Sequence, residues 1–345
     1  MFHPKQLIFS CFSFLVLLTL FGTTFATVLP DTLSVPVFRD ATIHFQPDSA
    51  GKYATEGLTA LDNGRILATK ITLPEYDSTV RIFARVVIKP IPKDERSVFD
   101  HWDRAGSIRL AQSGEPDIEI MRFMTSYGGR TEHDLEVTPL APLLRGDKTL
   151  KAFVDTWVTP GWKIDFTLTY IKTTDFDNPS WVDPVYFCDS FNKQDMPNGV
   201  EVETNVPAGL ARVAMVYYTT GHCTDGTDED EFVSKANVIS IDGTVAERMH
   251  PWRDDCRKNR EVNPYTARWS DGTWSSDLSR SGWCPGSLVY PNEFDFTDHL
   301  TPGKHKIKFV IENMRPKNEK GDFGYWRVSA FLVGWKKAPN LWQNR

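Results

Sequence analysis

Hydrophobic residues recur at every second position along much of this chain. Residues 162–170 read Trp-Lys-Ile-Asp-Phe-Thr-Leu-Thr-Tyr, with apolar side chains at alternate places. Such alternation predicts a β-strand with one buried face, and residues 80–88 and 305–312 follow the same pattern. Glycines and prolines, 22 of each, interrupt the strands at short intervals, and no segment carries a helical apolar stripe over three turns. We therefore predict an all-β protein built from antiparallel sandwiches.

The strand pattern occurs twice in the same order, which indicates an internal repeat. In each copy an alternating strand ends in threonine, a glycine turn follows, the next strand finishes on an acid, and a similar strand closes the unit. The matched segments are 135–156 with 294–313, 162–168 with 326–332 and, more loosely, 73–88 with 206–218. We predict two copies of one sandwich, joined through residues 173–184, which contain two prolines and no periodicity.

The first 26 residues differ from the rest. A short polar start with Lys5 precedes the apolar run 7–22 and a few small residues. This order is typical of a secretory signal peptide, which we expect to be cleaved after about Ala26. The run is shorter than the roughly 20 residues of a spanning helix. We expect a secreted or periplasmic protein with no membrane partner after cleavage. The alternatives are an uncleaved anchor and lipid attachment at Cys11, whose place deep within the run argues against lipidation.

Composition narrows the class of partner. A cleaved chain of about 320 residues suits two domains. The net charge of −6 gives no reason to expect nucleic acid or an anionic membrane as partner. Eleven tryptophans and 12% aromatic residues are many for an exported protein, and the C–H faces of sugars pack on indole rings. The composition is therefore compatible with a carbohydrate-binding surface.

Four cysteines follow the predicted cleavage site: Cys188, Cys223, Cys256 and Cys284. An even number in an exported protein permits two disulfides, with three possible pairings. A bond between Cys256 and Cys284 would close a loop of moderate length and restrict the unfolded chain.

The first candidate for chemistry is Asp103, which lies between Trp102 and Arg104 where a loop becomes a strand. Such loops are where sandwich proteins place their sites. The competing interpretation is a solvated Asp103–Arg104 ion pair, worth under about 1 kcal/mol. A second candidate, Asp155, ends a strand, and alternation places it on the same face as Trp157. It could equally be an outward-facing polar residue at a strand end.

Two loops add further candidates. Residues 225–231 hold five carboxylates within seven positions, without the spacing of an EF-hand. We interpret most of them as solvated and expect only Glu231, beside Phe232, to point inward. The turn 279–286, Ser-Arg-Ser-Gly-Trp-Cys-Pro-Gly, combines the cation Arg280 and the indole Trp283 in a rigid segment.

Metal and cofactor chemistry find no support in the sequence. The eight histidines are scattered, and no cysteine pair has zinc spacing. Neither a Gly-x-Ser-x-Gly elbow nor a phosphate loop occurs. We expect neither a metal nor a cofactor.

Several stretches together resemble the peptide-N-glycosidase F family of secreted bacterial amidases. They are HWDRAGSIRL followed by IEIMRFMTSY, then LKAFVDTW, and SRSGWCPG. The resemblance covers roughly residues 65–335. It implies two eight-stranded antiparallel jelly rolls side by side, which we place at 27–175 and 183–340, with a site in the cleft between them. It also implies hydrolysis of the glycosylasparagine amide of an N-glycosylated peptide or protein, leaving Asp and releasing the glycan as a glycosylamine.

The resemblance also implies roles for single residues. Asp103 corresponds to the principal catalytic acid and Glu231 to a second carboxylate that acts through water, while Asp155 stands where the family has glutamate. The predicted substrate-binding residues are the arginines Arg104 and Arg280, the indoles Trp102 and Trp157, and Trp283 of the same turn as Arg280. Cys256 and Cys284 correspond to one family disulfide.

The chain also departs from the family pattern. Two other family disulfides have no counterpart, so we expect the loop of Glu231 to be less constrained and its alignment to shift by a place or two. Cys188 and Cys223 are left over and could pair with each other. Asp155 is one methylene shorter than glutamate, and a misplacement of about 1 Å can reduce a rate roughly 100-fold.

These residues permit a two-carboxylate mechanism for amide hydrolysis. We expect Asp103 to stay ionised beside Arg104, Glu231 to carry a proton, and the arginines to face the carbonyl oxygen. The protein is expected to act as a monomer. Two alternatives stay open: a non-catalytic carbohydrate-binding or adhesion protein on the same scaffold, and a copper-dependent oxygenase, which would need clustered His and Met ligands.

Overall fold

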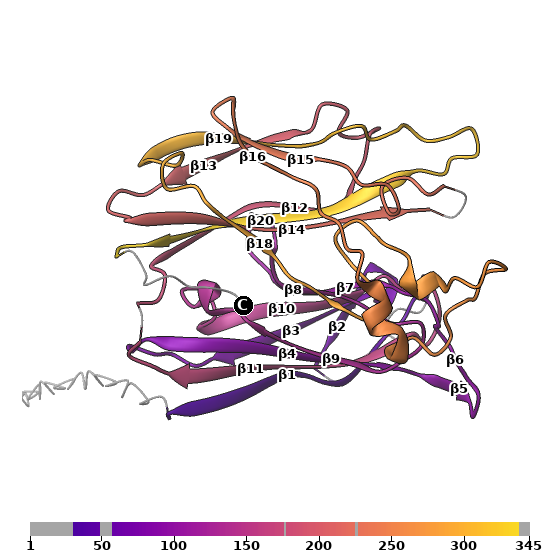
Figure 1. Ribbon diagram of the computed structural model, residues 1–345. Coiled ribbons are helices and arrows are strands. Elements are labelled where there is room, and N and C mark those ends of the chain that lie inside the picture. The colour runs from indigo at the N-terminus through magenta and orange to yellow at the C-terminus, as the bar shows by residue number, and fades with distance from the viewer. Residues whose placement is uncertain (1–29, 49–56, 176, 225–226, 338–345) are drawn as a thin grey trace, which may run out of the picture.

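Two β-sandwiches stack on each other, so that four sheets form four layers (Figure 1). This computed structural model describes residues 30–48, 57–175, 177–224 and 227–337. The predicted signal peptide, residues 1–26, lies outside the described residues. Among the described residues, no helix has the length and apolar character needed to cross a bilayer. The antiparallel all-β fold predicted from alternation is confirmed.

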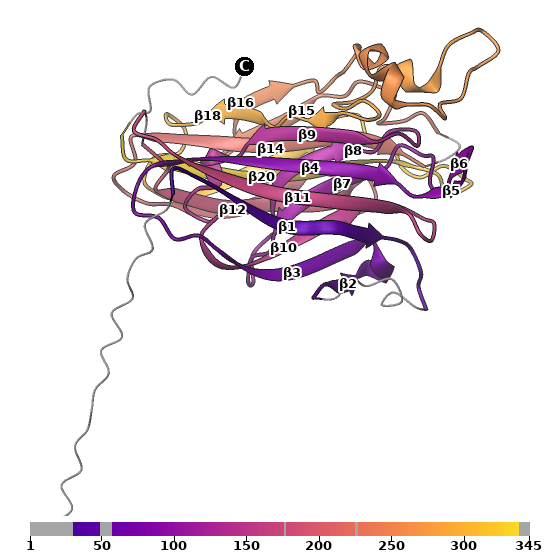
Figure 2. The same cartoon turned by 90° about the horizontal axis from the view of Figure 1, so that it is seen from below.

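The first sandwich is built by the N-terminal half of the chain together with one short strand, β17, from the C-terminal half. Its outer sheet has the strand order β1 (Thr32–Ile43), β11 (Trp162–Lys172), β4 (Val80–Pro90), β9 (Thr131–Glu136). Its inner sheet has the order β17 (Leu288–Val289), β8 (Ile118–Met124), β7 (Ala105–Leu110), β10 (Gly146–Val154), β3 (Ile66–Leu73), β2 (Thr59–Leu61). Figure 2 shows the outer sheet nearest the viewer.

The second sandwich repeats this plan. Its inner sheet has the order β12 (Trp181–Phe191), β20 (Gly324–Trp335), β14 (Arg212–Cys223), β18 (Asn292–Asp295). Its outer sheet has the order β13 (Val200–Val206), β19 (Gly303–Ile311), β15 (Asn237–Ile241), β16 (Thr244–Met249). Strand β20 takes the place of β11 and β14 that of β4, so the segments matched in the sequence are structurally equivalent.

Short elements lie outside the four sheets. The hairpin β5 (Pro92–Asp94) and β6 (Ser97–Val98) precedes the loop of Asp103. The 3₁₀ turns are η2 (Asp62–Gly64), η3 (Thr138–Leu140), η4 (Cys256–Val262) and η5 (Ser275–Asp277). The segment with η4 and η5, orange in Figure 1, lies at the same end of the sandwiches as β5 and β6.

Burial explains where the two halves meet. Strand β11 alternates as predicted, with Trp162, Ile164 and Phe166 fully buried. Strands β14 and β20, in contrast, are buried on both faces. One face of this sheet, with Met215, belongs to the second core, while the other, with Phe331, joins the first core. The inner sheets therefore pack face to face, and strands buried on both sides read as nearly continuous apolar runs.

The predicted junction is shorter than the sequence suggested. Strand β12 already begins at Trp181 and includes Pro184, inside the segment that we expected to be irregular. Because β12 is an edge strand, a proline can be accommodated there, and a register shift follows it between Pro184 and Tyr186.

Candidate functional site

One buried guanidinium joins an acid from each sandwich. Arg280 is 1% exposed. Its Nη2 lies 3.4 Å from Asp103 Oδ2 and its Nε 3.1 Å from Glu231 Oε1. Asp103 belongs to the loop before β7, and Glu231 to the loop after β14. Two carboxylates 128 positions apart in the sequence thus bind the same arginine side chain.

Asp103 is held in place by the backbone on either side of it. The buried Thr125 Oγ1 donates to the Trp102 carbonyl at 2.8 Å and accepts from the Arg104 amide at 2.7 Å. A single hydroxyl therefore fixes both neighbours of the acid. The Asp103 carboxylate is left to face Arg280 rather than the strand.

Arg104 does not pair with Asp103. Its Nε lies 3.1 Å from Asp100 Oδ2, a fully buried carboxylate that also accepts from Thr156 Oγ1 and Trp162 Nε1. The surface ion pair considered in the sequence analysis is therefore not formed. Arg104 instead helps to seat the loop, while Arg280 supplies the cation next to Asp103.

Glu231 approaches Arg280 from the second sandwich. Its backbone carbonyl accepts from the Ser281 amide at 2.8 Å, which ties it to the turn that carries Arg280. Its Oε2 accepts from the amide and thiol of Cys223 at 3.4 and 3.3 Å. The side chain is 14% exposed, so it points inward as we predicted.

Burial raises the pKa of both acids. For Glu231, burial raises the pKa to about 7, opposed by Arg280 and supported by the negative charge of Asp103. For Asp103, burial also raises the pKa, against the lowering effects of Arg280 first and of Tyr127 next. Arg104 has the smallest effect on it. We expected Arg104 to keep Asp103 ionised, but burial outweighs the small lowering effect of Arg104, and the pKa of Asp103 is raised.

Asp155 belongs to a neighbouring charge group. Its Oδ1 lies 3.0 Å from Arg65 Nη1, and its Oδ2 lies 2.6 Å from Arg327 Nη2 of the second sandwich. It is thus a partly buried bridge, not an outward-facing strand end. Its amide donates to the carbonyl of Ala105, two residues past Asp103, so the two acids lie at one end of the inner sheet.

The predicted indoles fall into two kinds. Trp102 and Trp157 are 50% and 54% exposed. The Arg65 guanidinium lies 4.5 Å above the Trp157 ring, and the Trp102 ring lies 6.3 Å from that of Tyr127. Trp283, in contrast, is 2% exposed and donates to the Gly221 carbonyl. Our prediction that Trp283 binds substrate is contradicted, because its ring is buried against Arg280, 4.8 Å away.

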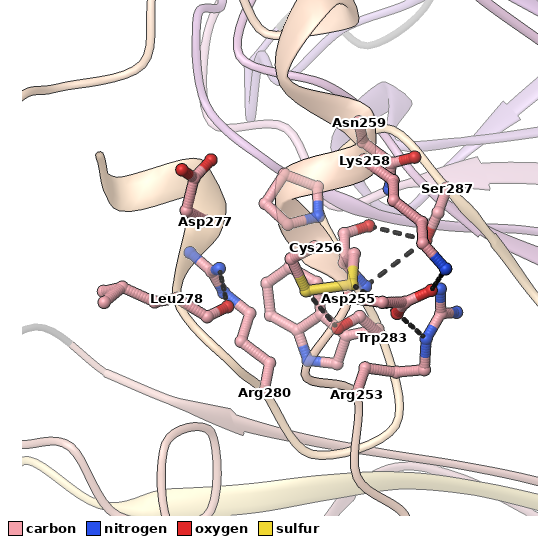
Figure 3. Close-up of a disulfide and its surroundings, with 12 residues drawn as sticks. Arg253, Asp255, Cys256, Lys258, Asn259, Asp277, Leu278, Arg280, Trp283 and Ser287 are labelled. Carbon is pink, nitrogen blue, oxygen red and sulfur yellow. Dashed lines mark hydrogen bonds and ion pairs between the residues drawn. A yellow bond between two sulfur atoms is a disulfide. The ribbon is translucent and has the colours of Figure 1, made fainter. Parts of the chain in front are cut away.

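A disulfide fixes the turn that carries Arg280. Cys256 and Cys284 are bonded, as the resemblance implied. In Figure 3 this bond lies beside Trp283, with Arg280 next to the indole. Arg280 Nη1 also donates to the Leu278 carbonyl at 2.9 Å. Within the described residues Cys188 and Cys223 do not form the disulfide that we considered.

Sequence reasoning missed Tyr127 as a member of the site. Arg280 Nη2 donates to its phenol oxygen at 3.4 Å, and Ser275 Oγ lies 3.0 Å away. Burial raises the pKa of Tyr127, so it stays a neutral phenol beside Asp103. It lies in the stretch IEIMRFMTSY that carried the resemblance, which was the available signal.

Comparison with family models covers both halves of the chain. Residues 34–115 and 108–170 match the model described as Peptide-N-glycosidase F, N terminal. Residues 190–333 match Peptide-N-glycosidase F, C terminal. The two matches include Asp103, Asp155, Glu231 and Arg280.

Individual relatives are more distant. The Peptide-N(4)-(N-acetyl-beta-D-glucosaminyl)asparagine amidase F of Elizabethkingia miricola is 24% identical over 289 residues, 78% of each chain. A structure of PNGF-II is 27% identical with a TM-score of 0.78, over 89% of this chain and 66% of that one, so this chain spans about two thirds of PNGF-II. PNGase F from Flavobacterium meningosepticum, called a glycosylasparaginase, is 19% identical with a TM-score of 0.67, over 90% and 99% of the chains, and shows the shared double-sandwich fold.

Proposed function

Because the chain belongs to the peptide-N-glycosidase F family, we propose that it cleaves the amide between an N-linked glycan and asparagine. Water adds to the amide carbon, and the C–N bond breaks. The peptide keeps an aspartate and the glycan leaves as a glycosylamine. The substrate is an N-glycosylated peptide or protein.

The site supplies the groups that this reaction needs. One group must take a proton from water, and another must protonate the departing nitrogen. Glu231, with a pKa of about 7, can hold or release a proton near neutral pH. Asp103, between Arg280 and Tyr127, orients the water or the first sugar. Arg280 is buried, and its N–H groups already bond to both acids, Tyr127 and the carbonyls of Leu278 and Ser275, so its part is to hold the two carboxylates in place.

The observation that carries the proposal is the meeting of Asp103 and Glu231 on Arg280, at 3.4 and 3.1 Å. If the two carboxylates faced separate surfaces of the protein, they could not act on one bond. The half-exposed Trp102 adjoins Asp103 and lies beside Tyr127, and the half-exposed Trp157 lies over Arg65, the partner of Asp155, so both rings are open to pack against sugar.

A turnover assay tests the proposal. The mature protein is given a denatured N-glycoprotein in ¹⁸O-labelled water, and mass spectrometry follows conversion of Asn to ¹⁸O-labelled Asp. We expect conversion by the wild type and a loss of at least about 100-fold in Asp103→Asn and Glu231→Gln. Asp134→Asn, an exposed acid of β9, is the control. Unchanged conversion in Asp103→Asn would remove that residue from its role.

The exposed indoles also favour a second candidate, a carbohydrate-binding protein without turnover. The same experiment separates the two. Binding of a glycopeptide that is weakened by Trp102→Ala, with no Asp formed by the wild type, would support the binding protein and contradict the amidase.

A further inference from the structure

We propose that Asp230, clamped by Lys235 and Trp326, is a positioning residue that sets the place of Glu231. The inference rests on the proposed function, because it concerns the placement of a carboxylate assigned to the reaction. Its basis is the set of contacts that Asp230 makes inside the second sandwich.

Asp230 is a fully buried acid with two strong partners. Its Oδ1 accepts from Trp326 Nε1 at 3.0 Å and lies 3.0 Å from Lys235 Nζ. Lys235 is itself 3% exposed and also reaches Glu229 and the Asn313 carbonyl, each at 2.9 Å. The ammonium therefore ties two consecutive acids of the loop to the sandwich behind them.

The backbone leaves room for this arrangement only because two glycines face it. A methyl group on Gly324 would come within 1.9 Å of Asp230 Oδ2, and one on Gly221 within 2.1 Å of the Asp230 carbonyl oxygen. Asp230 has a φ of +65°, a left-handed conformation that aspartate tolerates better than most residues. The acid therefore fits one position and has little freedom to move.

Asp230 and Glu231 point in different directions from neighbouring Cα atoms. The first side chain enters the core beside Trp326, and the second reaches Arg280. A buried ion pair is seldom retained for stability alone, because removing two charges from water costs about as much as their attraction returns. Here the directional bonds of Asp230 hold the loop so that Glu231 meets Arg280.

Two variants test the placement. Gly324→Ala changes no charge and intrudes on Asp230, whereas Asp230→Asn keeps the shape and removes the charge opposite Lys235. For both, we expect kcat to fall by roughly 10- to 100-fold with KM within about 2-fold, because Glu231 is displaced from the reacting atoms. Gly334→Ala is the control, because it lies in the same strand and its methyl would press on Leu210 and the Trp181 ring rather than on Asp230.

A pH profile distinguishes positioning from general destabilisation. Burial raises the pKa of Glu231 to about 7, so a loosened and better solvated Glu231 should titrate lower. In the pH dependence of kcat, the apparent pKa that belongs to Glu231 should be lower in both variants and unchanged in Gly334→Ala. Hydrogen exchange should also quicken in residues 227–234 of both variants.

The outcomes separate this inference from the proposed function. Suppose that Glu231→Gln abolishes turnover, whereas Gly324→Ala and Asp230→Asn keep the wild-type kcat and the wild-type pH dependence of kcat. The positioning role is then wrong and the amidase proposal stands. If Glu231→Gln turns over normally, the assignment of Glu231 fails first. A fall in thermal stability alone, equal to that of Gly334→Ala, would also contradict the positioning role.

Discussion

Arg280 neutralises two carboxylates at once, and this shapes the chemistry around it. Its Nε donates to Glu231 and its Nη2 to Asp103 and Tyr127, while the guanidinium carbon lies 4.8 Å from the centre of the Trp283 ring. A lysine ammonium is a compact charge that cannot occupy these positions together. The geometry of the two acids therefore depends on the guanidinium shape, not only on the presence of positive charge.

We predict that Arg280→Lys lowers kcat/KM by at least about 100-fold, because a lysine cannot hold both acids and one of them is displaced. Steady-state hydrolysis of a defined glycopeptide measures the effect. Arg248→Lys, in an exposed pair with Glu312, is the control and should behave as wild type. A loss below about 3-fold in Arg280→Lys would contradict the shared-cation arrangement.

The raised pKa of Glu231 also predicts how stability depends on pH. The folded pKa is about 7 and the ordinary value 4.5, so the contribution of this group is fully present below about 4.5 and is lost as the pH rises through about 7. Glu231→Gln should therefore be more stable than wild type at pH 8, by on the order of 2 kcal/mol. Urea unfolding at pH 4 and pH 8 measures this difference, which should shrink at pH 4.

At this scale the sequence predicted some residues and missed others for a physical reason. Asp103 and Glu231 stood out by motif and neighbours, but the burial of Asp230 did not, because five close carboxylates look like a solvated loop. Burial of Asp230 depends on Lys235 and on Trp326, 96 positions away. Linear patterns do not contain such pairings.

The turn 279–286 acts as one element that presents Arg280. Loss of its disulfide in the double variant Cys256→Ala/Cys284→Ala should cost about 3–4 kcal/mol for a loop with a sequence separation of 28. Turnover should fall at temperatures where the protein is still folded, because the turn loosens around Arg280. Denaturant unfolding and glycopeptide turnover, with Cys188→Ala as control, measure both effects. Equal turnover in the double variant and the control would show that the turn holds without the bond.

Strands were predictable wherever one face meets solvent. Alternation marks β4, β11 and β19 correctly, since water enforces polar residues on one side. It is weak in β14 and β20, where the first sandwich covers the face that would otherwise meet solvent. Alternation is lost in these strands because the two inner sheets pack on each other. The same packing brings together the two ends that carry Asp103 and Glu231.

For the whole molecule, a buried polar group connects the sandwiches. Arg122 of β8 binds Glu119 in its own sandwich and reaches Thr220 Oγ1 and the Arg327 carbonyl of the other. Ser329 Oγ donates to Glu119 from across the boundary at 2.6 Å. These bonds fix the relative position of the inner sheets, and with it the distance between Asp103 and Glu231.

Arg122→Met should therefore destabilise the protein by about 3–5 kcal/mol, because Glu119 is left buried without its cation. We expect a lower melting temperature in calorimetry and a loss of turnover as the acids separate. Arg248→Met, which breaks an exposed pair, should leave the melting temperature near that of wild type. If Arg122→Met unfolds as wild type does, the polar group does not hold the sandwiches together.

Strand β17 should hold the two halves of the protein together after a protease cut between the sandwiches. Leu288 and Val289 come from the second half of the sequence, yet they pair with Phe123 and Arg122 at the edge of the first inner sheet. A protease cut between Lys172 and Trp181 would leave the C-terminal fragment supplying that edge. The nicked protein would migrate as two bands on a denaturing gel but elute as one particle on gel filtration. An N-terminal fragment made separately would lack the edge strand β17 of its inner sheet. Mixing it with the C-terminal fragment should restore that sheet.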